Sequence, residues 1–313
     1  MTSSNSQRHF LTLFAFCLLI QGCTSKVSDT SRVIDIGNGR SIFLECKGNG
    51  RPTVILVTGL AERADDWMIT TNNKQPVFQG VASFTTVCAY DRPGTQKGTE
   101  KGWELSRSTS ISYEATVKDS AEDLNALLAA SGEPAPYVLV GHSLGGPIIR
   151  LYASEHPDKV AAFVFDDALS EYLIDGLDEE QVRLFQKLND PDFQGAPPNS
   201  EKTLFSEAVV PLMRAAKSPP QVPTIILTAD QWILLPELIA SGKLPKEFNQ
   251  HFSDALWKSQ IEAQKKFAAL FKGAKHVTKT NAEHYIHRTQ PQLVIDSIRE
   301  VVDQVRSASE SHP

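Results

Sequence analysis

The chain has 313 residues, of which 41% are hydrophobic and 22% are charged, and its formal net charge is −6 at pH 7. This acidic balance gives no basic surface of the kind that binds nucleic acid, so we expect no nucleic-acid partner. Without the signal segment predicted below, 291 residues remain, which is enough for one large domain that carries an inserted subdomain.

Residues 1–22 predict a signal peptide. The polar start carries Arg8, and the apolar segment 10–20 that follows is too short to span a bilayer as a helix. The sequence Leu19-Ile20-Gln21-Gly22-Cys23 resembles a bacterial lipobox, in which Cys23 is lipidated and becomes the first residue of the mature protein. That resemblance implies an exported, lipid-anchored protein of the cell envelope, in the outer membrane if the host is Gram-negative, with no other membrane contact. A plain secretory signal, giving a soluble periplasmic or secreted protein, is the alternative.

The next elements predict an α/β fold. Residues 23–31 are rich in Ser, Thr and Asp and predict a flexible tether. Gly37-Asn38-Gly39 is a hairpin signal between the first two strands. Beyond it, short apolar strands alternate with amphipathic helices, which predicts a mostly parallel sheet covered on both faces. The predicted strands cover residues 32–36, 41–46, 53–57, 86–90, 137–140, 162–165, 224–227 and 275–280, and the predicted helices cover residues 112–131, 147–156, 179–188 and 292–306.

The most informative segment is Gly141-His142-Ser143-Leu144-Gly145-Gly146, which lies between a predicted strand and a predicted helix. A serine in such a tight turn, with small neighbours, is lifted clear of the sheet and is exposed for attack. Ser143 is therefore the candidate nucleophile. The Leu144 N–H at the start of the helix is a candidate donor to an oxyanion formed beside Ser143.

Several motifs together resemble the α/β-hydrolase family. They are the serine turn, Asp66-Trp67, Ala89-Tyr90-Asp91-Arg92-Pro93-Gly94, and Glu283-His284-Tyr285-Ile286-His287 before the last helix. The resemblance implies an eight-stranded sheet with helices on both faces, a core of residues 32–168 and 222–307, and a helical lid insertion of residues 169–221. It also implies that the Leu60 N–H is the second oxyanion donor, although Thr58-Gly59 stands where many members have His-Gly.

A serine hydroxyl needs a base and a group that orients the base. The resemblance places the base at His284, with His287 as the competitor; His142, beside the nucleophile, is expected to line the site or to pack. Asp230, after the strand 224–227, is the favoured acid.

Asp167, or its neighbour Asp166, after the strand 162–165 is the alternative acid, because both strand ends face the same crevice. We expect Trp232, close to Asp230, either to contact the substrate or to pack within the protein.

Cys46 and Cys88 lie in strands that the family fold places side by side. They either form a disulfide in an oxidising compartment or remain two buried thiols.

The expected activity is hydrolysis of a small acyl substrate, with a carboxylesterase as the leading interpretation. An aminopeptidase and a haloperoxidase-like perhydrolase are alternatives on the same residues, and a non-catalytic surface lipoprotein that binds a ligand is a third. We expect no cofactor. We also expect no metal site, because His284 and His287 lack the glutamate spacing of a metallohydrolase.

Overall fold

The computed structural model describes residues 29–71, 73–112 and 115–310. The predicted signal peptide, the lipobox and Cys23 lie outside the described residues. The first strand, β1 (Thr30–Gly37), begins two residues earlier than predicted. The predicted end of the tether at residue 31 is therefore wrong, because Thr30 and Ser31 already pair with Cys46 and Glu45.

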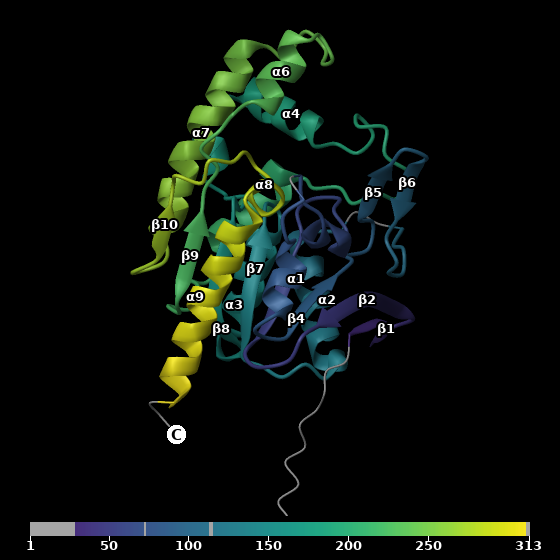
Figure 1. Ribbon diagram of the computed structural model, residues 1–313. Coiled ribbons are helices and arrows are strands. Elements are labelled where there is room, and N and C mark those ends of the chain that lie inside the picture. Colours follow the sequence, from purple (N-terminus) through teal and green to yellow (C-terminus); the bar gives the residue numbers. More distant parts are fainter. Residues whose placement is uncertain (1–28, 72, 113–114, 311–313) are drawn as a thin grey trace, which may run out of the picture.

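The described chain forms an eight-stranded sheet in the order β1-β2-β4-β3-β7-β8-β9-β10 (Figure 1). The pairs β1–β2 and β2–β4 are antiparallel, and all other neighbours in the sheet are parallel. The predicted fold class is confirmed. The remaining strands of this sheet are β2 (Arg40–Lys47), β3 (Thr53–Val57), β4 (Val87–Tyr90), β7 (Tyr137–His142), β8 (Val160–Asp166), β9 (Thr224–Leu227) and β10 (Lys275–Val277).

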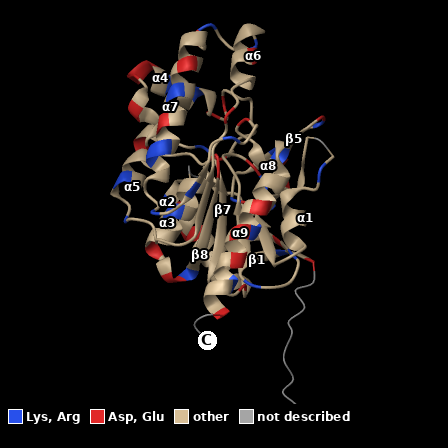
Figure 2. Cartoon of the chain, turned by 60° about the vertical axis from the view of Figure 1, so that its left-hand side comes forward, with Lys and Arg blue, Asp and Glu red and all other residues tan. Residues whose placement is uncertain are grey.

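Helices cover both faces of the sheet, because its central strands are largely apolar and are buried along their whole length. On one face lie α1 (Val77–Ala82) and α9 (Pro291–Glu310), and on the other lie α2 (Val117–Ser131) and α3 (Gly145–Glu155). Figure 2 shows that most positions occupied by Lys, Arg, Asp or Glu belong to helices and loops, with few along the strands.

The helix predicted to start at residue 112 starts later. Thr116 is the N-cap of α2 and forms a capping box with Asp119, which fixes the first turn at residue 117. At the other end, Gly132 adopts a φ of 78° and terminates the helix as predicted.

The cover over the carboxyl ends of the strands is larger than the predicted lid insertion. Residues 169–221 form η3 (Leu173–Gly176), α4 (Glu179–Leu188), η4 (Phe205–Val209) and α5 (Val210–Ala215). Two further helices, α6 (Leu234–Ala240) and the long α7 (Gln250–Ala268), belong to the segment between β9 and β10 that was assigned to the core. In Figure 1, α4 and α6 lie with the upper part of α7 above the sheet. The lid is therefore built from both segments.

A small hairpin of β5 (Gln96–Thr99) and β6 (Gly102–Leu105), which the sequence analysis did not predict, lies beside the lid (Figure 1). The Gln96 N–H donates to the Ala61 carbonyl at 2.9 Å, so this hairpin braces the loop that follows β3.

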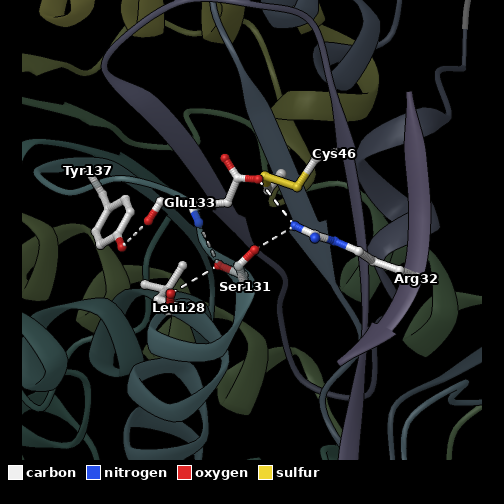
Figure 3. The surroundings of a disulfide bond; sticks show 7 residues. Arg32, Cys46, Leu128, Ser131, Glu133 and Tyr137 are labelled. Carbon is white, nitrogen blue, oxygen red and sulfur yellow. Dashed lines mark hydrogen bonds and ion pairs between the residues drawn. A yellow bond between two sulfur atoms is a disulfide. The ribbon is translucent and has the colours of Figure 1, made fainter. Parts of the chain in front are cut away.

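Cys46 and Cys88 are directly opposite each other on β2 and β4 and form a disulfide. Figure 3 shows its surroundings, in which Arg32 of β1 binds the carboxylate of Glu133 and the Ser131 carbonyl at the end of α2. These contacts fasten the antiparallel edge of the sheet to the helix. Among the described helices, none is both long and apolar enough to cross a bilayer.

Candidate active site

Ser143 lies in the turn between β7 and α3 with a φ of 48°, a left-handed conformation that residues other than glycine rarely adopt. Glycines lie two residues away on either side of Ser143, at positions where a side chain has no room. A Cβ on Gly145 would lie 2.3 Å from the Val57 carbonyl oxygen, and one on Gly141 would lie 2.8 Å from the backbone of Gly145. The close contact of β3, β7 and α3 thus holds the strained serine turn in place.

His284 lies in the loop after β10 and contacts Asp167, which follows β8. The His284 Nδ1 and Asp167 Oδ2 atoms are 2.6 Å apart, and Asp167 Oδ1 accepts a hydrogen bond from the Ala229 N–H at 3.0 Å. This contact assigns the proton to Nδ1 and leaves Nε2 to accept one. Burial opposes the charged imidazole, but the hydrogen bond and charge of Asp167 outweigh it and raise the pKa of His284 above its usual value.

The structure does not bring Asp230, the favoured acid, into contact with the His284 ring. Its Oδ1 atom accepts hydrogen bonds from the Ala282 N–H at 3.0 Å and the Thr280 hydroxyl at 3.2 Å, and its own N–H donates to the Ala282 carbonyl at 3.0 Å. The carboxylate is thus bound by the loop that carries His284 instead of by the imidazole. The alternative, Asp167, has the geometry expected of the acid.

His287 lies outside the cavity, in a buried cluster beneath the site. Its Nδ1 donates to Asp166 and its Nε2 donates to Asp66, both at 2.6 Å. Burial disfavours the charged ring, but the two carboxylates outweigh it and raise the pKa of His287 to about 10. We therefore assign His287 as a buried cation that holds two loops together.

His142 is also buried, with 1% of its side chain exposed. Its Nδ1 contacts Glu62 Oε2 at 3.1 Å, and its Nε2 lies 3.2 Å from the His284 carbonyl oxygen. Of the two roles expected for His142, lining the site or packing, the structure shows packing: it is not among the cavity residues, and its ring nitrogens contact the Glu62 carboxylate and the His284 carbonyl.

Asp66, His142 and His287 offer three atoms close enough together to hold a metal ion. The ring nitrogens of His287 already donate to carboxylates, and Arg288 binds the Asp66 carboxylate. Cys46 and Cys88 are also grouped, with Glu133, but their sulfurs are joined to each other. Neither group offers a set of free ligands.

Ser143, Asp167 and His284 all line one cavity of about 350 Å³, a volume suited to a small organic molecule. Leu60 and Leu144 line it as well, and in the described part of the chain neither of their backbone N–H groups has a hydrogen-bond acceptor. These two amides are therefore available to an oxyanion.

The wall of this cavity is mostly apolar, and the residues that form it include no lysine or arginine. Trp232 belongs to it and also packs, since its ring stacks on Trp257 and its Nε1 donates to Ser253 at 2.8 Å. The lid supplies most of the large apolar side chains, namely Leu169, Leu173, Phe185, Leu188, Phe205, Leu234, Leu235, Leu238, Leu256 and Trp257.

Helix α7 contributes to the cavity, which the sequence-based prediction did not include. Asn249 caps this helix, and its buried residues Phe252, Leu256, Ala263 and Phe267 recur at helical spacing. These two signals together would have predicted the helix, and with it Leu256 and Trp257 as cavity residues.

Comparisons with known proteins agree with this architecture. A family model described as alpha/beta hydrolase fold matches residues 52–295. An uncharacterized protein of Schizosaccharomyces pombe is 28% identical over 148 residues, which cover 41% of this chain and 26% of that protein. The matched segment thus spans about a quarter of that relative's length.

Solved structures show the same fold at low sequence identity. A thermophilic esterase from Thermogutta terrifontis is 17% identical with a TM-score of 0.53, and covers 88% of this chain and 99% of its own. A bromoperoxidase from Bacillus anthracis is 16% identical with a TM-score of 0.55, covering 88% and 100%. Est816, described as an N-acyl homoserine lactone degrading enzyme, is 16% identical with a TM-score of 0.54, covering 86% and 99%.

Proposed function

The chain belongs to the α/β-hydrolase family, and on that premise we propose that it is a serine hydrolase that cleaves carboxylic esters through an acyl-enzyme. One observation carries the proposal: Ser143, the His284–Asp167 pair and the Leu60 and Leu144 residues all line one cavity. The backbone N–H groups of these two leucines have no hydrogen-bond acceptor in the described part of the chain.

In the acylation step, the Ser143 oxygen attacks the ester carbonyl carbon while its proton passes to His284 Nε2. The carbonyl oxygen becomes an oxyanion, which accepts hydrogen bonds from the Leu60 and Leu144 N–H groups. The tetrahedral adduct then collapses, the bond to the alcohol oxygen breaks, and the alcohol leaves with the proton held by His284. Asp167 stabilises the transient imidazolium and keeps the imidazole in the tautomer that can accept the proton.

Water completes the cycle. It attacks the acyl carbon and gives one proton to His284, and the second tetrahedral adduct collapses to release the acid. The Ser143 oxygen recovers the proton from His284, so the enzyme returns to its starting state.

The cavity favours neutral esters with apolar groups. Its charged lining residues are Asp167, Glu283 and, when protonated, His284, and no basic side chain is present to pair with a substrate carboxylate. A substrate with a carboxylate next to its reacting carbonyl would therefore lose water from that charge without gaining a basic partner, which disfavours its binding. An aminopeptidase would need a carboxylate for the substrate amine, and the one lining acid besides Asp167, Glu283, shares its charge with the Ile233 and Leu234 N–H groups through Oε1. The ester is thus better supported than the amide.

A series of nitrophenyl esters with acyl groups of increasing length, alongside amide and lactone comparators, tests the reaction and the size of the cavity together. We expect hydrolysis of the esters, loss of nearly all turnover in Ser143→Ala, and fluorophosphonate labelling that disappears in the same variant. An unlabelled wild-type protein would refute the proposal and favour a ligand-binding scaffold. Oxidation of a halide by peroxide in the presence of a short carboxylic acid, in place of ester hydrolysis, would favour the perhydrolase.

We also propose that the protein is exported and lipid-anchored through Cys23. The apolar segment 10–20 and the lipobox-like sequence support this, and a disulfide fits an oxidising compartment. Labelled palmitate should be incorporated into the wild-type protein but not into Cys23→Ser. A wild-type protein that takes up no label would leave the plain secretory signal as the better explanation.

A further inference from the structure

The loop after β3 carries the Leu60 donor, and the backbone around Leu60 is held on both sides by one buried ion pair. Arg92 follows β4, and Glu201 belongs to the lid insertion. The two side chains are joined by a bidentate contact, from Nε to Oε1 at 2.7 Å and from Nη2 to Oε2 at 2.9 Å. Their side chains are 1% and 2% exposed, so the pair has almost no contact with water.

Both members of the pair also bind the loop backbone. Arg92 Nη2 donates to the Gly59 carbonyl at 2.6 Å, and Nη1 donates to the Thr58 carbonyl at 3.0 Å. Glu201 Oε2 accepts from the Ala61 N–H at 2.8 Å. Ala61 has a φ of 59°, a conformation that costs free energy in a residue other than glycine and persists only where neighbours enforce it.

These contacts determine the direction of the Leu60 N–H. The carbonyl of Gly59 and the N–H of Leu60 belong to one planar trans peptide, in which they point in opposite directions. Because Arg92 holds the carbonyl on its own side, the N–H faces away from Arg92. The next peptide plane is held by Glu201 through the Ala61 N–H. Both peptide planes that meet at Leu60 are therefore fixed.

We propose that Glu201 is a positioning residue by which the lid sets the oxyanion site, acting through Arg92 and the Ala61 N–H on the Leu60 donor. This inference rests on the proposed serine hydrolase function. It makes the second donor depend on a residue of the lid, 109 positions from Arg92 in sequence.

The lid segment that carries Glu201 also contacts the cavity, since Thr203 and Phe205 line it. The same segment approaches the core closely at Gly94, where a Cβ would lie 2.8 Å from the Glu201 nitrogen. The Glu201 N–H donates to the Gly94 carbonyl at 2.8 Å. A substrate that displaces this segment would therefore disturb the oxyanion site as well as the cavity wall.

Glu201→Gln tests the proposal, because it keeps the shape of the side chain but removes the charge. The matched control is Glu207→Gln, since Glu207 is an exposed lid acid whose carboxylate contacts Gln186. For each variant, kcat and KM are measured with a nitrophenyl ester. Inhibition constants are measured for an alkyl boronic acid, which forms a tetrahedral adduct with the active serine, and for a long-chain alcohol, which fills only the cavity.

For Glu201→Gln, we expect kcat to fall about tenfold or more, towards the roughly hundredfold loss known for removal of one oxyanion donor. KM and the inhibition constant of the alcohol should stay within about twofold, whereas the boronic acid should weaken by the same factor as kcat/KM. Glu207→Gln should behave as the wild-type protein. Glu201→Asp, which retains the charge that Arg92 requires, should recover part of the lost kcat.

A folded Glu201→Gln variant with wild-type kcat would overturn the proposal, and so would a loss of kcat without a matching loss of boronic acid affinity. If Glu201→Gln does not fold, Glu201→Asp decides, because its carboxylate is one methylene shorter and cannot keep both the bidentate contact with Arg92 and the hydrogen bond from the Ala61 N–H; a folded Asp variant with wild-type kcat and boronic acid affinity would therefore also overturn the proposal. Failure of the proposed function gives a different result, in which the wild-type protein and Glu207→Gln neither hydrolyse the ester nor react with a fluorophosphonate.

Discussion

Exchange of Asp167 for asparagine is the most direct test of the acid assignment. The Asp167 carboxylate accepts from His284 Nδ1 at 2.6 Å and from the Ala229 N–H at 3.0 Å. Asparagine would keep one oxygen for the Ala229 N–H and turn its NH₂ group towards His284. The imidazole would then accept at Nδ1 and carry its proton on Nε2, where it cannot remove the Ser143 proton.

The size of the effect follows from this change of tautomer. Triads whose aspartate is replaced by asparagine keep their geometry but lose about four orders of magnitude in kcat. At 1.36 kcal/mol per tenfold, that is about 5.5 kcal/mol of transition-state stabilisation. The pH profile should change too, because Asp167 is the main cause that raises the pKa of His284. Activity requires the neutral imidazole, so its rise with pH should shift to lower pH in the variant.

The assay is the pH dependence of kcat/KM for a nitrophenyl ester in Asp167→Asn and in Asp230→Asn. Asp230 accepts hydrogen bonds from the Ala282 N–H and the Thr280 hydroxyl, and an asparagine oxygen can still accept both. We expect Asp230→Asn to lose less than about tenfold in activity and to keep the wild-type profile. Activity retained in Asp167→Asn together with a large loss in Asp230→Asn would show that our assignment of the acid is mistaken.

Three further changes test the surroundings of the site. The pKa of His287 is about 10 in the folded protein and 6.5 when unperturbed, so its stabilising effect is complete below pH 6.5 and lost as the pH rises to about 10. Urea unfolding should show this decline in the wild-type protein and a flatter one in His287→Gln. The Cys46–Cys88 disulfide closes a loop of 42 residues, so the double alanine variant should lose up to about 4 kcal/mol of unfolding free energy; incorporation of two alkyl groups without reductant would disprove the bond. Gly145→Ala would place a methyl group 2.3 Å from the Val57 carbonyl oxygen, and unchanged stability in urea would contradict the packing described for the serine turn.

Local sequence determined what could be predicted of the fold. The bounds predicted for β3 and α4 coincide with the observed ones, because pattern and end signals lie within the segment itself. The serine turn was also predictable from local sequence, because Gly141 and Gly145 lie two residues away on either side of Ser143, whereas the close approach of β3 that leaves room only for glycine at position 145 depends on the fold. The start of α2 differs from its predicted position because the capping box of Thr116 and Asp119, and not the apolar pattern, sets the first turn.

The acid could not be chosen from sequence, because β8 and β9 are parallel neighbours and both end at the same crevice. Asp166 is level with Leu227, so Asp167 stands only one residue beyond the sheet. It adopts a φ of 42°, and its carboxylate bridges the Ala229 N–H and His284. Asp230 lies further along the loop after β9, where its N–H donates to the Ala282 carbonyl of the loop that carries His284.

The residues that sequence analysis missed share one property, which is that their role depends on a distant partner. Nothing in the local sequence around Glu201 marks it as functional. Arg92 belongs to a motif of the family, but the sequence does not show that its partner is Glu201. A buried charge on either side alone would be unfavourable, so the two must be retained or lost together. The pair therefore ties the lid to the loop that holds the Leu60 donor, and a lid from another relative would preserve activity only if it returned a carboxylate to Arg92.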